Sequence, residues 1–417
     1  MNRQHFLASH RLTTRRFFLR CGGAGLVALQ SLPLLAQSDD EGEPLELAID
    51  DLPPWLTDPN DFQDVSRGNP KPHSLSDERM REVGLTRDTW RLQVIADPEN
   101  PARLRSPMSS DNGTALDFAG LMQLASKHAV RFPKVMTCLN IGCPLGNGIW
   151  EGVPLRTVLW MADPTADLRR VTYFGYHNED DEQMFRSSLP VGRVLEDVFG
   201  LPPVILCYKL NGQWLTPERG APVRMVVPEA YGFKSIKWLS HVLLSNLPHA
   251  NDTYAEKNND VDSPLKTFCA TLSIPKKIAP GQPIPITGWA QSGISGLDKV
   301  QVWIHDTKDQ LPSDDKYFDK APWRDAEILP PPERWAGVPD DRIPSATVGF
   351  DDASGRPTRW PLRLTQAHWA MLHPGLPPGQ YTLRCRTIDE QHQAQPMPRP
   401  FRKSGHASIE QRSIVVE

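Results

Sequence analysis

The stretch "LNGQWLTPERGAPVRMVVPEAYGFKSIKWL", residues 210–239, begins inside a predicted β-hairpin. The segment "PVILCYKLNGQWL" turns at Asn211-Gly212, a pair that accepts the positive φ angles of a two-residue hairpin loop. Upstream, strand-like and helix-like patterns alternate. The strand candidates are "TWRLQVIA", "FPKVMTC" and "RRVTYFGY", and the helix candidates are "ALDFAGLMQLASKHAV", "PLRTVLWMA" and "VGRVLEDV". This mixture predicts an α+β domain over residues 61–262.

Downstream of about Val261, helical signals fade and short alternating segments separated by turns replace them. These segments are "KTFCATLSIP", "QPIPITGWAQ", "DKVQVWIHD", "WRDAEILP", "QYTLRCRTID" and "RSIVVE". Together with long loops at 307–320 and 329–358, they predict an antiparallel β-sandwich over residues 263–417. Residues 37–60 are acidic and interrupted by prolines, which predicts an extended arm rather than a domain.

Residues 1–36 have the pattern of an export signal. Arg15 and Arg16 precede an apolar run of about fifteen residues that ends near Ala36. A transmembrane anchor needs about twenty apolar residues, so we expect a cleaved twin-arginine signal and no membrane anchor in the mature form. Because the twin-arginine export machinery carries proteins that fold first, typically around a cofactor, the signal predicts a periplasmic cofactor protein.

Charge and cysteine usage narrow the function classes. Residues 1–36 carry five Arg and no acidic residue, so their removal shifts the formal net charge from −4 to −9. An acidic protein is a poor candidate for binding nucleic acid. The five cysteines left after cleavage do not form a disulfide-framework pattern, and they include neither a CxxC pair for zinc nor a CxxCH motif for c-type haem. Any electron partner must therefore be a separate molecule.

Two of those cysteines, Cys138 and Cys143, lie in "VMTCLNIGCPLGNGIWEGVPL", residues 135–155. We expect a loop here, because the segment is too rich in glycine and proline for a helix. Its glycines suggest a phosphate-binding loop, but no Lys-Ser/Thr pair follows them. A cysteine–histidine nucleophile is another reading, and no local signature supports it.

The order of these segments resembles the sulfite oxidase family of molybdopterin enzymes. The resemblance covers roughly residues 60–417, and its most specific part is the spaced pattern "LNGxxLxxxxGxPxRxxVPxxxGxxxxKWL". It implies a sulfite-oxidase-type molybdopterin-binding domain followed by an immunoglobulin-like antiparallel β-sandwich that dimerises. It further implies a molybdenum-molybdopterin cofactor, a homodimer, and an external electron acceptor such as a c-type cytochrome.

The resemblance also implies a set of site residues. Cys138 stands at the position of the family's metal-binding cysteine, and soft sulfur suits molybdenum. Tyr254 stands where a tyrosine points at the metal's oxo group, and Arg67 where a cation offsets anionic charge. The implied cofactor contacts are Asn69, His73, His177, Arg219, Arg224, Ser235, Ile236 and Lys237, with Arg219 in place of a family histidine.

Departures from the family pattern bear on the substrate. After Cys138 the family continues with an anion-binding arginine and a long loop, whereas this chain has Cys143 in the arginine's place and a shorter loop. Arg402 and Lys403 lie near the position of a further family arginine. The leading expectation is oxo transfer to a small sulfur compound such as sulfite. The alternatives are a reductive enzyme acting on a sulfoxide and a non-catalytic exported binding module that lost the metal.

Overall fold

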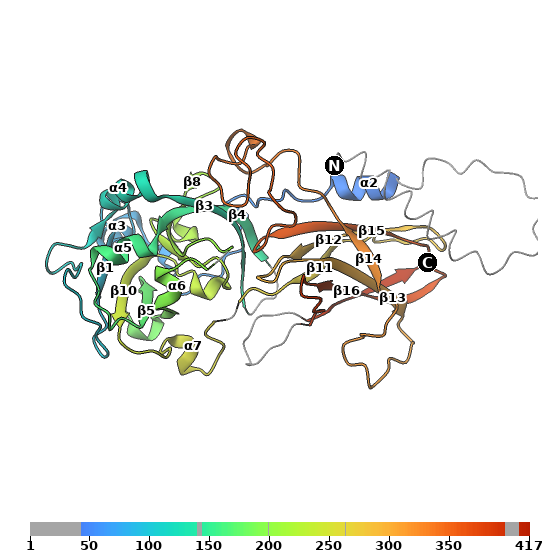
Figure 1. The fold of residues 1–417 in the computed structure, drawn as a ribbon. Helices are drawn as coiled ribbons and strands as arrows, with labels where there is room; N and C mark the ends of the chain where they lie inside the picture. Colours follow the sequence, from blue (N-terminus) through green and yellow to red (C-terminus); the bar gives the residue numbers. More distant parts are fainter. Residues whose placement is uncertain (1–42, 140–143, 199, 263, 397–407) are drawn as a thin grey trace, which may run out of the picture.

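The computed structural model describes all residues except 1–42, 140–143, 199, 263 and 397–407. Its two halves lie side by side along the long axis of the molecule (Figure 1). The first half combines sheets and helices, and the second half is built from strands. The predicted boundary near residue 262 falls between helix α7 (Thr253–Glu256) and strand β11 (Phe268–Ser273).

A five-stranded mixed sheet forms one layer of the first half, in the order β2-β1-β10-β5-β6. Strands β1 and β10 pair in parallel and the other neighbours pair antiparallel. The strands are β1 (Arg91–Ala96), β2 (Leu116–Asp117), β5 (Arg170–Gly175), β6 (Ser187–Pro190) and β10 (Leu239–Ser245). Leu92 and Val94 of β1 and Val242 of β10 are fully buried in the largest apolar core of the chain.

A second, antiparallel sheet has the order β3-β4-β7-β8, with β9 also paired to β7. Its strands are β3 (Val130–Thr137), β4 (Pro144–Pro154), β7 (Ile205–Leu210), β8 (Gln213–Trp214) and β9 (Arg224–Val226). The predicted hairpin is therefore present, with Asn211 and Gly212 at positive φ between β7 and β8.

The expectation of a loop at 135–155 is wrong for most of that segment, because residues 144–154 form strand β4. The glycines of β4 reflect close packing rather than a turn. A Cβ atom at Gly148 would lie 2.5 Å from the Leu210 side chain, and one at Gly152 would lie 2.4 Å from the Leu206 carbonyl oxygen. Only glycine lets β4 approach its neighbours so closely.

Short helices connect these strands. The α-helices are α2 (Glu43–Asp50), α3 (Asp77–Glu82), α4 (Phe118–His128), α5 (Leu155–Met161), α6 (Val191–Leu195) and α7, and the 3₁₀ helices are η3 (Pro72–Ser74), η4 (Asp181–Gln183), η5 (Pro217–Arg219), η6 (Gly232–Lys234) and η7 (Pro339–Asp341). The Asp117 carboxylate caps α4 by accepting a hydrogen bond of 2.7 Å from the Gly120 N–H. None of the helices in the described residues is long and apolar enough to cross a membrane.

Within the predicted extended arm over residues 37–60, residues 43–50 instead form helix α2. Leu45 and Ile49 are four positions apart and therefore share one face of the helix. This face packs against Leu329 and Ala370 of the second half. The contact supplies the apolar burial that an isolated eight-residue helix in water lacks.

The second half is one antiparallel sheet with strand order β11-β12-β15-β14-β13-β16-β17. The strands after β11 are β12 (Ile284–Gln291), β13 (Lys299–Asp306), β14 (Arg324–Ile328), β15 (Gln366–His373), β16 (Gly379–Ile388) and β17 (Glu410–Val416). The sheet curls until its two ends meet, since Glu410 of β17 accepts hydrogen bonds of 2.6 and 2.7 Å from the Thr271 N–H and hydroxyl of β11. The predicted α+β domain followed by an antiparallel sandwich is confirmed.

Candidate active site

A cavity of about 360 Å³ opens in the first half, beside the end of strand β3. Its walls come from the segment before η3, from the turns after β5, from the stretch between η5 and β10, and from α7. Nine of the eleven predicted site residues line this cavity: Arg67, Cys138, His177, Arg219, Arg224, Ser235, Ile236, Lys237 and Tyr254. Asn69 and His73 do not line it. The folded chain thus brings together residues that are up to 187 positions apart in the sequence, from Arg67 to Tyr254.

Cys138 directly follows strand β3, and its side chain is partly exposed and unpaired by any disulfide. The strand is anchored from the second half of the chain. The Val135 N–H donates a hydrogen bond of 2.8 Å to the Leu364 carbonyl oxygen, and the Thr137 hydroxyl donates to the Gln291 side chain. Cys143, predicted to replace an anion-binding arginine, lies outside the described residues.

Three cations cluster at one end of the cavity. The buried Arg224 guanidinium donates hydrogen bonds to the carbonyl oxygens of Arg219 (2.9 Å) and Ser235 (2.7 Å). Burial lowers the pKa of Arg224 to about 10. Burial, together with the positive charges of Arg224 and Arg219, lowers the pKa of Lys237 to about 7. Cations held this close together favour a bound anion.

The unpaired hydrogen-bond donors of this cluster fit an anionic cofactor. The Nε atoms of Arg219 and Arg224 are buried, and neither has a hydrogen-bond partner within the described residues. Buried donors of this kind are normally satisfied. A molybdopterin cofactor carries a phosphate and several hydrogen-bonding edges, so its chemistry matches donors lining a cavity next to a free thiol. The residues present therefore fit the cofactor that the family uses.

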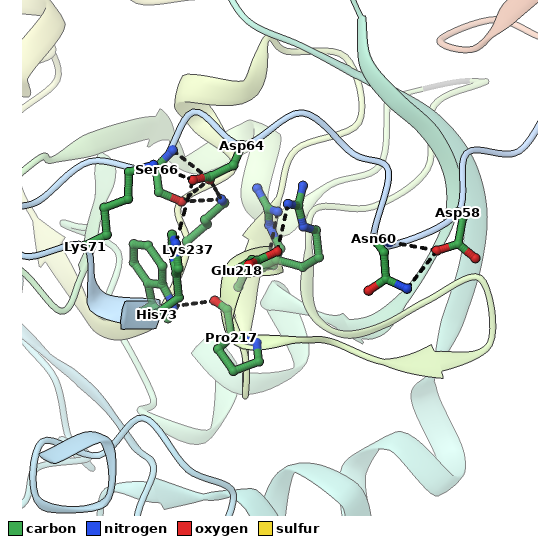
Figure 2. Close-up of polar contacts among 12 residues, drawn as sticks. Asp58, Asn60, Asp64, Ser66, Lys71, His73, Pro217, Glu218 and Lys237 are labelled. Carbon is green, nitrogen blue, oxygen red and sulfur yellow. Dashed lines mark hydrogen bonds and ion pairs between the residues drawn. The ribbon is translucent and has the colours of Figure 1, made fainter. Parts of the chain in front are cut away.

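Asp64 is not among the predicted site residues, but its carboxylate is the centre of a group of polar contacts beside this cluster (Figure 2). Its carboxylate accepts hydrogen bonds from Lys71 (2.8 Å) and Lys237 (3.1 Å) and pairs with both ammonium groups. Lys237 also donates a 2.6 Å hydrogen bond to the Ser66 hydroxyl. These interactions hold the pKa of the Asp64 carboxyl far below its usual range, against the opposing effect of burial. Asp64 thereby neutralises a lysine that would otherwise be an isolated buried cation.

The predicted residues Asn69 and His73 lie near this hub but outside the cavity wall. The His73 Nε2 atom is 3.8 Å from the Asp64 carboxylate, and its ring lies 6.1 Å from that of Trp238. The Asn69 N–H donates a 2.8 Å hydrogen bond to the Gln183 side chain. A direct contact of either residue with the cofactor stays a prediction.

Tyr254 lies at the other end of the cavity, within an aromatic group. Its ring stacks on Phe233 at 4.0 Å and meets the edge of Phe185 at 5.8 Å. The Arg67 guanidinium lies 4.1 Å from the centre of the Phe185 ring. Burial raises the pKa of Tyr254 to about 12, with an opposing effect from Arg67 and a further increase from Cys138. Arg67, Cys138 and Tyr254 therefore share one electrostatic neighbourhood.

The remaining predicted residues form the wall between these ends. His177 is hydrogen bonded through Nδ1 to the Gly175 carbonyl oxygen (3.1 Å), and its ring packs edge-on against Phe174. The Ser235 N–H donates to Gly232 and the Ile236 carbonyl accepts from Met225, so both segments are fixed by internal bonds. Within the described residues, no group of three or more His, Cys, Asp or Glu side chains could hold a metal ion.

Comparison with known proteins identifies the domain that contributes most of the cavity wall. Residues 84–253 match the oxidoreductase molybdopterin binding domain. A nitrate reductase (NADH) of Spinacia oleracea is 26% identical over 182 residues, which are 42% of this chain and 19% of that protein. A sulfite oxidase of Arabidopsis thaliana is 22% identical over 245 residues, covering 48% of this chain and 61% of that protein. The chain thus spans less than two thirds of these curated relatives.

The overall fold has a solved counterpart. The crystal structure of the sulfane dehydrogenase SoxCD from Paracoccus pantotrophus superposes with a TM-score of 0.55 at 16% sequence identity, over 93% of this chain and 96% of that one. The arrangement of molybdopterin domain and strand-rich second half is therefore shared. Together with the domain match, these similarities assign molybdopterin-bound molybdenum as the cofactor of the first half. Residues 84–253 therefore belong to the oxidoreductase molybdopterin binding domain family, and the chain is similar to sulfite oxidases.

Proposed function

We propose that this protein is a periplasmic oxidoreductase that transfers an oxygen atom to a small sulfur compound such as sulfite and passes two electrons to an external carrier. The observation that carries the proposal is the cavity itself. In it a free thiol, Cys138, lies beside two buried arginines, Arg219 and Arg224, whose Nε donors lack partners within the described residues.

Each group of residues has a role in this proposal. Cys138 would ligate the metal, and Arg219, Arg224 and Lys237 would bind the cofactor's anionic end through charge-assisted hydrogen bonds. When bound, the molybdenum cofactor supplies oxygen-atom transfer coupled to two-electron redox chemistry. Arg67 would attract an anionic substrate, and the Tyr254 hydroxyl, which stays protonated because its pKa is about 12, would donate a hydrogen bond to a substrate oxygen.

The same site suggests a second candidate, reduction of a sulfoxide. Arg67 is the single Lys or Arg residue that lines the cavity outside the cluster of three cations, among the described residues. A neutral substrate needs no stronger positive potential. In this direction the substrate would lose an oxygen atom and electrons would enter from the external carrier.

The sequence supports the proposed location and partners. The twin-arginine pattern supports export to the periplasm, and the lack of a c-type haem motif in the sequence supports a separate acceptor such as a c-type cytochrome. The family resemblance supports a homodimer formed through the second half. Sedimentation of the exported protein tests the dimer, and cell fractionation tests the location.

Metal and pterin analysis of protein purified from the periplasm is the decisive experiment. We expect molybdenum near one atom per chain and reduction of cytochrome c on addition of sulfite. Sulfoxide-dependent oxidation of a reduced dye, without sulfite activity, would favour the second candidate. A protein free of metal and pterin when expressed in cells that load other molybdoenzymes would refute both enzymatic proposals and favour a binding module.

A further inference from the structure

The cavity has two chemically different ends. At one end, the charges of Arg224, Arg219 and Asp64 act on the pKa of Lys237. At the other, Arg67, Cys138 and Asp252 act on the pKa of Tyr254. The cation cluster therefore belongs to the end where the cofactor's phosphate would bind. The other end is aromatic, and Cys138 borders both ends. It packs against the apolar cluster that contains Phe62 and Trp150, whose rings lie next to Arg219 and Arg224, and it also raises the pKa of Tyr254.

Apolar and aromatic side chains dominate the aromatic end of the cavity. Phe233, Tyr254 and Phe185 form a continuous aromatic group through one stacked and one edge-to-face contact. Leu139, the neighbour of Cys138, lines the same cavity and packs in one apolar cluster with Tyr254 and Phe233. Such a surface binds the apolar part of a ligand by removing it from water and by contact with the aromatic rings. It offers little to the oxygens of a small inorganic anion.

Among the described residues that line this end, one side chain, Arg67, is a lysine or arginine, and the predicted cations Arg402 and Lys403 lie outside the described residues. Arg67 is exposed, lies against the face of Phe185, and has no carboxylate partner within the described residues. His177 also lines the cavity, but it lies 3.7 Å from Asp181 and is bonded to Gly175. One guanidinium beside an aromatic face suits a ligand with a single negative charge and an apolar substituent.

We propose that the preferred substrate is an organic sulfinate, R–SO₂⁻, whose apolar group R rests against Phe185, Phe233 and Tyr254 while its oxygens face Arg67. This inference rests on the proposed function and specifies its substrate class. A sulfinate has the sulfur lone pair of sulfite, with a carbon substituent in place of one oxygen. In the overall reaction, R–SO₂⁻ gains one S–O bond to an oxygen from water and becomes R–SO₃⁻. Two protons are released, and two electrons reduce two equivalents of a one-electron acceptor.

The first test compares substrates on the unmodified holoenzyme with ferricyanide as acceptor. We expect kcat/KM for benzenesulfinate to exceed that for sulfite by about tenfold or more, and methanesulfinate to lie between them, because each added apolar group gains contact with the wall. A second readout does not depend on turnover. Benzenesulfonate, the product, should raise the thermal unfolding temperature more than sulfate at the same concentration.

Two variants locate the effect. Phe185→Leu should lower kcat/KM for benzenesulfinate about tenfold and reduce the shift caused by benzenesulfonate, with little change for sulfite. Trp214→Leu is the matched control, since Trp214 also lies under cations, at 4.3 Å from Arg87 and 4.7 Å from Lys209, but outside the cavity. Trp214→Leu should change kcat/KM for neither sulfite nor benzenesulfinate.

The outcomes separate this inference from the proposed function. An active molybdenum enzyme that prefers sulfite, or a Phe185→Leu variant that affects sulfite and benzenesulfinate equally, would overturn the sulfinate assignment alone. A protein without molybdenum and without turnover of any sulfur compound would overturn the proposed function. The benzenesulfonate shift in the two variants would then still decide whether the aromatic end binds apolar sulfur oxyanions.

Discussion

The two halves of the molecule treat buried charge differently. The first half encloses two fully buried lysines, Lys134 and Lys234, in addition to the arginines of the cavity. Among the described residues, the second half buries no lysine. Its buried arginines, Arg384 and Arg386, keep 9% and 7% exposure and lie over the rings of Phe318 and Trp323. Burying a charge opposes folding unless it is paired or hydrogen bonded. The half that buries lysines is also the half that contains the cavity.

Each buried lysine is held by backbone oxygens. Lys134 donates a 2.8 Å hydrogen bond to the Ala230 carbonyl, and Lys234 donates 2.6 Å to that of Ser188. Burial lowers the pKa of Lys134 to about 7 and that of Lys234 to about 8. Lys234 immediately precedes the predicted cofactor contacts at residues 235–237, and its partner Asp252 caps α7, which carries Tyr254. The buried charge thus connects two walls of the cavity.

The largest expected effect is that of Cys138→Ser on the first half. Replacing a soft sulfur ligand by a hydroxyl should remove nearly all bound molybdenum, because the metal's protein ligand is lost. Metal analysis of the purified variant measures this, with Cys207→Ala as control because Cys207 is a buried thiol outside the cavity. Full molybdenum content in Cys138→Ser would contradict the assignment of the ligand.

Lys234→Met should cost about 3–5 kcal/mol of unfolding free energy, because the buried Asp252 carboxylate would keep its hydrogen bonds but lose its cationic partner at 3.9 Å. Denaturant unfolding of the cofactor-free protein measures the change. The matched control in the second half is Lys299→Met, which removes the exposed pair with Asp325 at 3.5 Å and should cost less than about 1 kcal/mol. An equal loss of unfolding free energy in Lys234→Met and Lys299→Met would show that the buried lysine of the first half is no more important for stability than an exposed lysine of the second half.

The pH dependence of stability tests Lys237. Burial and the nearby arginines lower its pKa from 10.5 to about 7 in the folded, cofactor-free protein. Between pH 7 and 10.5 the unfolded chain therefore binds more protons, and the free energy of unfolding should rise with pH by at most about 1.4 kcal/mol per unit from this group. Below pH 7 the residue is protonated in both states and adds no slope.

The contribution of Lys237 is isolated by the difference between the unmodified protein and Lys237→Met, measured by denaturant unfolding at several pH values. The slope should be smaller in the variant. It should also shrink when the cofactor is bound, because a phosphate favours the charged lysine. Identical slopes in the unmodified protein and the variant would show that Lys237 titrates normally.

A small effect is expected from a substitution in the core of the second half. Cys385→Ala should cost about 1 kcal/mol of unfolding free energy, since it removes a buried thiol that donates to Glu410 at 3.3 Å. Molybdenum content should not change. A loss of metal in this variant would show that the two cores are energetically coupled.

Local patterns predicted much of the fold. The Asn-Gly turn and the alternation around it located β7 and β8, and Cys138 was correctly placed at the end of a strand. Strand β15, in "QAHWAMLH", was missed because nearly all of its side chains are buried, so it does not alternate between apolar and polar residues. The glycines of β4 led to the wrong prediction of a loop, because their role there is to allow close packing between strands.

The site was predictable only where a family pattern fixed it. The stretch 210–239 supplied Arg219, Arg224 and Lys237, and all three line the cavity. Asp64 carries no motif, and its partner Lys237 is 173 positions away, so only the folded chain reveals it. The aromatic wall was missed for the same reason, because Phe185 and Phe233 become neighbours of Tyr254 only after folding.

The contacts between the halves limit how this protein could be rebuilt from parts. Trp55 packs at 5.1 Å from Trp335, and the Leu364 carbonyl holds the strand that ends in Cys138. A chimera that joins the first half to the sandwich of a distant relative would lose these anchors behind the thiol. A chimera should therefore fold and function only when residues 329–365, between strands β14 and β15, come from the same protein as the first half. The unit that must be kept together is larger than the domain defined by the sheets of the first half.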